Sequence, residues 1–382
     1  MNINKREINL NQMLTLMILF LIGGSALSSS ARYAGQNVWI VLLASGILGA
    51  LLFTMFYRIS KLHQFAELPN ILTNTFGLYL GKIVLVVFGC FFFFRMISAG
   101  NYMTALAQET LMMGANHRTV VVMILVTIII SSLYGLNVIG RSSEIFLGIV
   151  LICLLPFLLS IFTSDIFKSE NLIPILAEGI PGITQDIVRT TFFPYGELVI
   201  FLMIFPFVTK IEDKSILKRG YIAITIATLL MIAISLTTVA LLGATLTTNF
   251  EYPFYNAMQL AGISGFLERL DPLAIVIKII SEYFKLVLYF FVTVMAFQAL
   301  YKKFNFKITL IVVSIATFFI APVVNIHEAG FMMDIMPTRI LPIFELAIPL
   351  VIWLVSEIRF RKIAPPLLQE IKLENRTNPG PA

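Results

Sequence analysis

Four residues that carry charge or donate hydrogen bonds recur at helical spacing within one long apolar stretch. Lys278, Glu282, Lys285 and Tyr289 stand at positions i, i+4, i+7 and i+11, so in a helix they form one stripe. This spacing allows Glu282 to pair with both lysines. Charges in an apolar helix should face protein or water rather than lipid. The stripe therefore predicts either a network that fixes helix packing or a polar pathway that contacts a ligand.

A second apolar stretch contains small residues near its middle. Gly23, Gly24 and Ser25 stand together there, and each glycine weakens a helix by about 1 kcal/mol relative to alanine. Backbone groups that such a break exposes can bind a ligand. Small residues also allow helices to pack closely in membranes, and for this stretch alone both interpretations stay open.

A third apolar stretch is interrupted in the same manner. Phe193, Pro194, Tyr195 and Gly196 precede Glu197, and proline removes a helix hydrogen bond and clashes with the preceding turn. A carboxylate at this depth is costly and is expected to face a cavity. We predict a broken helix whose free backbone contributes to a ligand site, with Glu197 as a buried charge.

Other polar residues in apolar stretches are weaker candidates. Arg95 and Tyr102 lie near one face of a long stretch, where Arg95 could reach the membrane surface or pair with another helix, and Tyr102 could line a ligand site. Glu345 stands alone in the last apolar stretch, and the sequence suggests no partner for it.

The composition requires that membrane helices position these residues. The chain has 382 residues, of which 58% are hydrophobic and 13% charged, with a mean hydropathy of +0.92. Soluble domains are about one quarter charged, and a helix needs about 20 apolar residues to cross a bilayer. We predict one transmembrane domain, residues 1–360, and a polar cytoplasmic tail, residues 361–382. The predicted spans are 10–31, 36–57, 82–112, 119–136, 143–163, 186–209, 219–243, 270–301, 306–324 and 339–357.

The distribution of Lys and Arg predicts the orientation of the chain. With both termini in the cytoplasm, the inside segments hold 17 Lys and Arg residues and the outside segments hold 5, as the positive-inside rule expects. The net charge of +6 follows from this bias, and we expect no nucleic-acid partner. Lys5 and Arg6 before an apolar stretch resemble a signal peptide, but we expect the small residues that follow to serve the helix break rather than cleavage.

The predicted spans divide into two sets of five with opposite orientation. Repeat one covers about 10–163 and repeat two about 186–357, and each begins with an interrupted helix. This is the inverted repeat of LeuT-type transporters, in which discontinuous helices 1 and 6 hold the ligand near the middle of the membrane. We therefore predict an all-α membrane protein of about ten transmembrane helices with this 5+5 fold.

No motif indicates a metal site, a cofactor or an enzyme. Cys90 and Cys153 lie in separate apolar stretches, and His63, His117 and His327 are far apart, so metal-ligand spacing is absent. The chain contains no nucleophile elbow and no phosphate-binding loop.

Three motifs resemble those of the spore germination permeases, the B subunits of nutrient germinant receptors. They are YGLNVIGRSSEI (134–145), FFPYGELVIFLMIFP (192–206) and GFLERLDPLAIVIKI (265–279), and the likeness covers roughly residues 8–360. The resemblance implies the amino acid–polyamine–organocation superfamily, a place in the spore inner membrane, and an A subunit and a lipoprotein C subunit as partners. In related transporters the two helix breaks hold the substrate. By motif they match Gly23, Gly24 and Ser25, and Phe193 to Gly196, although IGGSAL is only a partial match.

Three functions follow from these expectations. The first is a receptor subunit that binds a small germinant, an amino acid in our leading version, between the two breaks, with walls from spans 3 and 8 and with segment 244–269 as a lid. The second is an autonomous amino acid transporter in which Glu197 and the charged stripe couple transport to protons or cations. The third is an assembly scaffold with a vestigial pocket.

Overall fold

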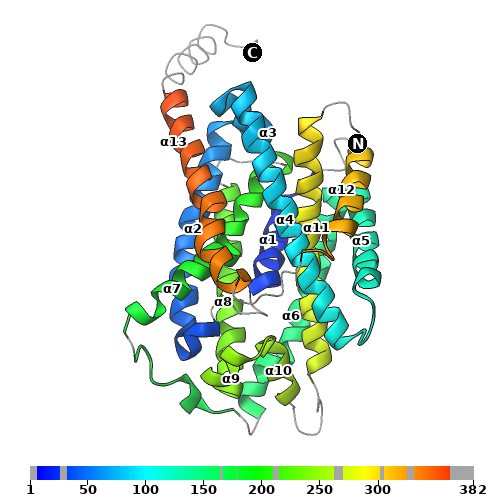
Figure 1. Ribbon diagram of the computed structural model, residues 1–382. Helices are drawn as coiled ribbons and strands as arrows, with labels where there is room; N and C mark the ends of the chain where they lie inside the picture. The colour runs from blue at the N-terminus through cyan, green and yellow to red at the C-terminus, as the bar shows by residue number, and fades with distance from the viewer. Residues whose placement is uncertain are drawn as a thin grey trace, which may run out of the picture.

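The computed structural model describes residues 7–25, 32–163, 167–177, 179–209, 215–261, 270–301, 305–324 and 331–361. Within these ranges every regular element is a helix, and the helices form an elongated bundle (Figure 1). The first part of the chain contains α1 (Leu10–Ser25), η2 (Arg32–Asn37), α2 (Val38–Leu62), α3 (Leu68–Phe76), α4 (Leu78–Thr110), α5 (His117–Tyr134), α6 (Leu136–Thr163) and η3 (Ser169–Leu172).

The second part of the chain begins with a helix in several pieces. Its elements are α7 (Pro181–Thr190), η4 (Thr191–Tyr195), η5 (Gly196–Met203), η6 (Phe205–Phe207), α8 (Ser215–Leu242), α9 (Ala244–Asn249), α10 (Pro253–Leu260), α11 (Asp271–Leu300), α12 (Phe306–Ile320), η7 (Phe331–Ile340), η8 (Ile343–Ala347) and α13 (Ile348–Arg361).

Six described segments are long and apolar enough to cross a membrane. They are Tyr33–Leu62, Leu78–Thr110, His117–Tyr134, Leu136–Ser160, Ser215–Leu242 and Ile335–Arg359. Leu10–Gly23 and Phe306–Ile320 are shorter apolar helices. The two remaining predicted spans correspond to the segmented helix from α7 to η6 and to α11, which carries the charged stripe. The chain is thus an all-helical protein with several membrane spans, and the count of ten stays a prediction.

The structure adds helices that the sequence analysis placed in connecting segments. The helices α3, α9 and α10 lie in segments expected to link spans. Residues 137–142, expected between the fourth and fifth spans, belong to α6, because the turn is made at Gly135, whose φ is +93°. Glycine adopts this left-handed backbone without a steric penalty, so a single residue separates α5 from α6.

The core of the bundle is built around α1 and α11. Leu16 to Ile22 of α1 are at most 1% exposed, and α1 packs against α6, α8, α11 and η4. In turn, α11 packs against α1, α4, α5 and α6. Figure 1 shows both helices inside the bundle. Residues on these two helices therefore have protein, not lipid, as their main surroundings.

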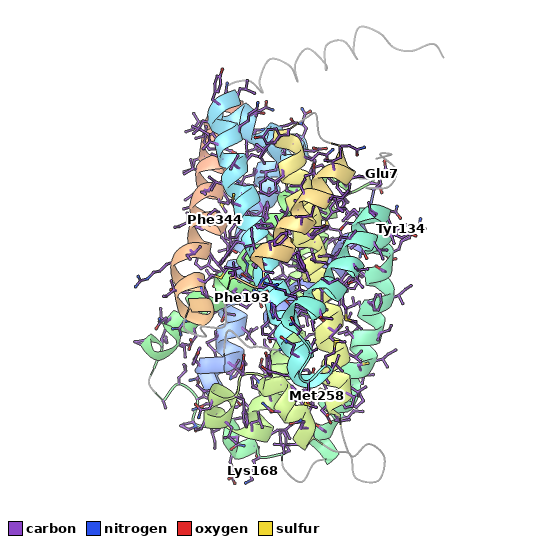
Figure 2. The ribbon with its side chains drawn as sticks, turned by 45° about the vertical axis from the view of Figure 1, so that its right-hand side comes forward. Glu7, Tyr134, Lys168, Phe193, Met258 and Phe344 are labelled. Atoms are coloured by element: carbon purple, nitrogen blue, oxygen red, sulfur yellow. The ribbon has the colours of Figure 1, made fainter. Side chains whose placement is uncertain are left out.

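The described ends of the chain lie at one end of the bundle. Glu7 and the last turns of α13 lie at the same end of the bundle, on opposite sides of it, and Lys168 lies at the other end (Figures 1 and 2). Ile8 is also held to the end of the segmented helix: its N–H donates to the Phe207 carbonyl at 2.9 Å, and its carbonyl accepts from the N–H of Thr209 at 2.8 Å. This pairing joins the start of span 1 to the end of span 6.

At the same end, a buried histidine connects three helices. His63 directly follows α2, beyond the apolar span that ends at Leu62, and its Nε2 lies 2.9 Å from the Ser356 hydroxyl of α13. The Thr75 hydroxyl of α3 lies 3.2 Å from the same Ser356 oxygen. Burial lowers the pKa of His63 to about 4, because desolvation disfavours the charged imidazolium.

We predict that His63 makes the folded protein sensitive to moderate acid. Its pKa is lowered by folding, so the unfolded chain binds a proton first, and stability falls as the pH decreases from about 6.5 towards 4. Between pH 7 and pH 5, the thermal unfolding temperature of the wild type should fall further than that of the His63→Gln variant. Equal falls in both proteins would contradict this role.

Candidate functional site

The central feature of the site is Glu197, a fully buried carboxylate in η5. Its Oε1 accepts hydrogen bonds from Nε of Arg95 at 2.8 Å, from Nη2 of the same arginine, and from the Tyr289 hydroxyl at 2.9 Å. Its Oε2 accepts from Nζ of Lys285 at 2.5 Å. Both oxygens of this carboxylate therefore have donors, two of them cationic, and Glu197 joins η5 to α4 and α11.

The side chain of Phe193 lies over both cations of this cluster. Its ring centre is 5.3 Å from the Arg95 guanidinium carbon and 4.3 Å from Nζ of Lys285. Aromatic faces attract cations at such distances. Figure 2 shows Phe193 between the Glu7 end and the Lys168 end of the bundle, so the cluster lies in its interior.

The predicted interruption of span 6 is present at Phe193. Its backbone has φ −127° and ψ 101°, which is not helical, between the α-helix that ends at Thr190 and the tight turns of η5. Tyr195 follows and its hydroxyl lies 2.7 Å from the Thr228 hydroxyl of α8. A Cβ on Gly49 would overlap the Tyr195 side chain, so α2 requires glycine there to let this segment approach.

The predicted interruption of span 1 at Gly23, Gly24 and Ser25 is not seen in the described residues, because α1 runs as continuous helix from Leu10 to Ser25. A Cβ on Gly23 would stand 2.6 Å from the Ser281 carbonyl oxygen of α11, so Gly23 serves close helix packing. Gly24 and Ser25 form the last turn of α1, and the structure describes only their backbone. The rest of the predicted span, residues 26–31, lies outside the described residues.

The charged stripe does not pair as the spacing predicted. Lys285 forms its ion pair with Glu197, not with Glu282. Lys278 donates to the Tyr102 hydroxyl, and its ammonium lies 4.3 Å from the ring centres of both Tyr102 and Tyr252. The prediction of a Lys–Glu–Lys network was therefore wrong: partners on other helices outcompete the neighbour one turn away.

Glu282 has no such compensation within the described part of the chain. It is 2% exposed, and its Oε2 has no hydrogen-bond partner. The backbone at Ser281 and Glu282 is the place where Gly23 contacts α11. A buried carboxyl oxygen without a hydrogen-bond partner thus lies beside Gly23 of α1.

Sequence comparisons agree with the motifs. The family described as "Spore germination protein" matches residues 7–329. The chain belongs to this family. It is 26% identical to Spore germination protein KB of Bacillus subtilis (strain 168) over 370 residues, covering 92% of this chain and 95% of that protein. It is 24% identical to Spore germination protein A2 of the same organism, covering 74% of this chain and 76% of that protein.

In this spore germination protein, Gly23 of α1 and the interruption at Phe193 lie against one stretch of α11. The helix α1 contacts both η4 and α11, with Gly23 against Ser281. Phe193 of η4 lies over Lys285, four residues further along α11. Residues 281–285 therefore contact both segments. Neither sequence motif alone indicated this shared position on α11.

Two contacts in the site had no signal of their own in the sequence. Arg95 pairs with Glu197 across 102 positions, and Glu345 lies against Gly196, where an added Cβ would overlap its carboxylate. Arg95 and Glu345 are each an ionisable residue in an apolar stretch. This pattern predicts that the side chain lies inside the protein, but it does not predict which residue the side chain contacts.

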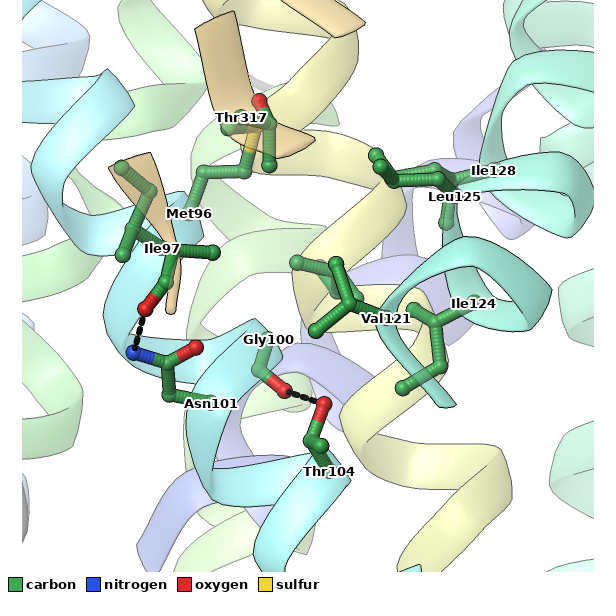
Figure 3. A pocket seen from close by; sticks show the side chains of 12 residues that line it. Met96, Ile97, Gly100, Asn101, Thr104, Val121, Ile124, Leu125, Ile128 and Thr317 are labelled. Carbon is green, nitrogen blue, oxygen red and sulfur yellow. Dashed lines mark hydrogen bonds between the residues drawn. The ribbon is translucent and has the colours of Figure 1, made fainter. Parts of the chain in front are cut away.

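Three cavities lie outside the predicted ligand-binding residues. One, of about 20 Å³, is apolar and lies between α4, α5, α11 and α12 (Figure 3). At its edge, Nδ2 of Asn101 donates to the carbonyls of Ala321 and Val324 at 2.9 and 2.8 Å, which closes the end of α12. The others are a polar cavity beside η2 and α9 and a groove between α2 and α8.

We predict that Glu197→Gln strongly destabilises the protein, because Arg95 and Lys285 then lose their counter-ion in the interior. Removal of one partner from a buried ion pair typically costs about 3–5 kcal/mol. Unfolding in one detergent, compared with the control Glu144→Gln at an exposed position of α6, measures the effect. A loss no larger than that of the control would show that Glu197 is not the anchor of the cluster.

Proposed function

We propose that this chain is the B subunit of a nutrient germinant receptor and that it binds a small germinant, an amino acid, where α1, η4 and α11 meet. The observation that carries the proposal is a pair of buried ionisable side chains on α11, Glu282 and Lys278, that form no ion pair in the described part of the chain. Glu282 has an unpartnered oxygen beside the end of α1. Lys278, one turn away, donates to the Tyr102 hydroxyl and lies over the rings of Tyr102 and Tyr252.

These charges suit the two ends of an amino acid. Glu282, whose Oε2 has no hydrogen-bond partner among the described residues, favours a ligand ammonium group. Lys278 favours the ligand carboxylate, with Tyr102 and Tyr252 as walls. Glu197, whose two carboxyl oxygens already accept hydrogen bonds, then has a structural role. Backbone groups or packing around the ligand come from Gly24, Ser25, Phe193, Pro194, Tyr195, Gly196 and Tyr289.

The proposed architecture is the LeuT-type inverted repeat with discontinuous helices 1 and 6. Support comes from the non-helical backbone at Phe193 and from two contacts on α11, that of Gly23 with Ser281 and that of Phe193 with Lys285. We place both termini in the cytoplasm and the protein in the spore inner membrane. The helices α9 and α10, within segment 244–269, would cover the entrance.

Signalling would follow from a change in the relative position of α1, η4 and α11. A ligand shifts an equilibrium only by its difference in affinity for two arrangements, and a ligand that touches all three segments has such a difference. The Glu197 cluster couples η5 to α4 and α11, so movement of the broken helix reaches the rest of the bundle. Partner A and C subunits would receive this change and permit germination.

An autonomous amino acid transporter is the second candidate. It is favoured by the buried, unpartnered carboxyl oxygens of Glu282 and Glu345, which could exchange protons during transport. Uptake of labelled amino acid into liposomes that contain only this chain would favour the transporter. Absence of uptake, with a germinant-dependent response in spores, would favour the receptor. Loss of function only through lower receptor levels would indicate the scaffold.

We predict that Glu282→Gln and Lys278→Gln each weaken amino acid binding at least tenfold, because each removes one charged contact, worth about 1.5–3 kcal/mol. A thermal-shift screen with amino acids, sugars and nucleosides first selects the tightest ligand. Its dose–response is then measured in both variants and in the control Glu144→Gln. An unchanged dose–response in both α11 variants would refute this site.

The methyl ester of the selected amino acid assigns the two ends of the ligand. The ester lacks the carboxylate, so it should bind the wild type more weakly than the parent does. Lys278→Gln should not weaken ester binding further, whereas Glu282→Gln should. The reverse pattern would contradict the proposed orientation.

A further inference from the structure

Glu345 is a second buried carboxyl group beside the Glu197 cluster. It lies in η8, within the last membrane-spanning segment, and is 0% exposed. Both of its carboxyl oxygens lack a hydrogen-bond partner among the described residues. One of them lies against Gly196, at the start of η5. The interrupted part of span 6 is therefore in direct contact with a carboxyl group that has no hydrogen-bond partner in the described part of the chain.

The charged and titratable groups that face Glu345 come from three elements. They are Glu197 of η5, Arg95 of α4, and Lys285 and Tyr289 of α11. The neighbouring η7 contributes Met336, whose sulfur accepts from Nη1 of Arg95 at 3.3 Å. Phe344 stacks on Phe91 of α4 at 4.3 Å between ring centres, which fixes η8 against α4.

The distribution of donors leaves Glu345 without a counter-ion in this arrangement. Arg95, Lys285 and Tyr289 all donate to Glu197. An ionised carboxylate without a partner is very costly in a protein interior, and such a group takes up a proton instead. With Glu345 neutral, Arg95, Lys285 and Glu197 together carry a charge of about +1, so the two cations could compensate a second carboxylate if Glu197 moved away.

We propose that Glu345 is a proton-binding site and the reserve counter-ion of the Arg95–Lys285 pair. It holds a proton while Glu197 occupies both cations. When the interrupted helix moves and withdraws Glu197, Glu345 releases its proton to water and its carboxylate takes the vacated donors. Rearrangement of span 6 is thereby linked to the release of one proton.

The packing at Glu345 favours a proton over a larger ligand. Its carboxyl group touches Gly196, so the space beside this carboxyl group is occupied by the main chain of the interrupted helix. A proton requires no cavity, whereas a ligand ammonium group requires room for itself and its carbon chain. The proton site at Glu345 is distinct from Glu282 and Lys278, to which the ammonium group and the carboxylate of the ligand are assigned.

The test is infrared spectroscopy of the full chain in lipid nanodiscs at neutral pH, without germinant. The carbonyl stretch of a protonated carboxylic acid is separate from the bands of an ionised carboxylate. We expect one such band to disappear in Glu345→Gln and to remain in the control Glu144→Gln. We expect the same band to disappear in Glu197→Gln, because Glu345 then ionises to compensate Arg95 and Lys285.

Lys285→Gln provides an independent test if Glu197→Gln does not fold. This variant removes one cation, so the band should persist to a higher pH than in the wild type. The proposal is overturned if Glu345→Gln removes no band, if Glu197→Gln folds and keeps the band, or if Lys285→Gln shifts its titration to lower pH. Because no germinant is present, these outcomes do not depend on whether an amino acid binds at Glu282.

Discussion

The structure depends on one electrostatic constraint: a carboxylate in the interior of a membrane protein requires full compensation. Glu197 meets this requirement with donors from two other helices, Arg95 on α4 and Lys285 and Tyr289 on α11. Because these donors are far apart in the sequence, their convergence fixes how η5, α4 and α11 lie relative to one another. The broken helix can lose its regular backbone hydrogen bonds at Phe193 because side chains hold it on both sides.

The same constraint divides the ionisable residues of the interior into two groups. Glu197, Arg95 and Lys285 satisfy one another and form the anchor. Glu282 and Glu345 have unpartnered carboxyl oxygens, and the phenols around Lys278 do not neutralise it. A buried charge without a counter-ion is unfavourable in an apolar interior unless a bound proton or a charged ligand neutralises it. The anchor holds the helices together, and the proposed sites for ligand and proton lie on ionisable groups outside it.

Much of this arrangement could be predicted from local patterns, and the rest could not. Proline and glycine marked the interruption at Phe193, apolar runs marked the spans, and helical spacing placed Lys278, Glu282 and Lys285 on one stripe. The choice of partner was not local: Lys285 selects Glu197 over Glu282 because helix rotation and packing decide which carboxylate it reaches. Arg95 and Glu345 could be recognised as internal, but their contacts join segments 102 or more residues apart. Gly23 matched a ligand motif, yet it packs on Ser281.

The most direct test of the central claim is a double-mutant cycle between Arg95 and Glu197. The free energies of unfolding of wild type, Arg95→Met, Glu197→Gln and the double variant would be measured in one detergent. If the pair is the anchor, Glu197→Gln leaves two buried cations without their carboxylate, Arg95→Met removes two of the hydrogen bonds to that carboxylate, and the double variant is less destabilised than the sum of the singles by about 2 kcal/mol or more. Additivity within about 0.5 kcal/mol would contradict the account.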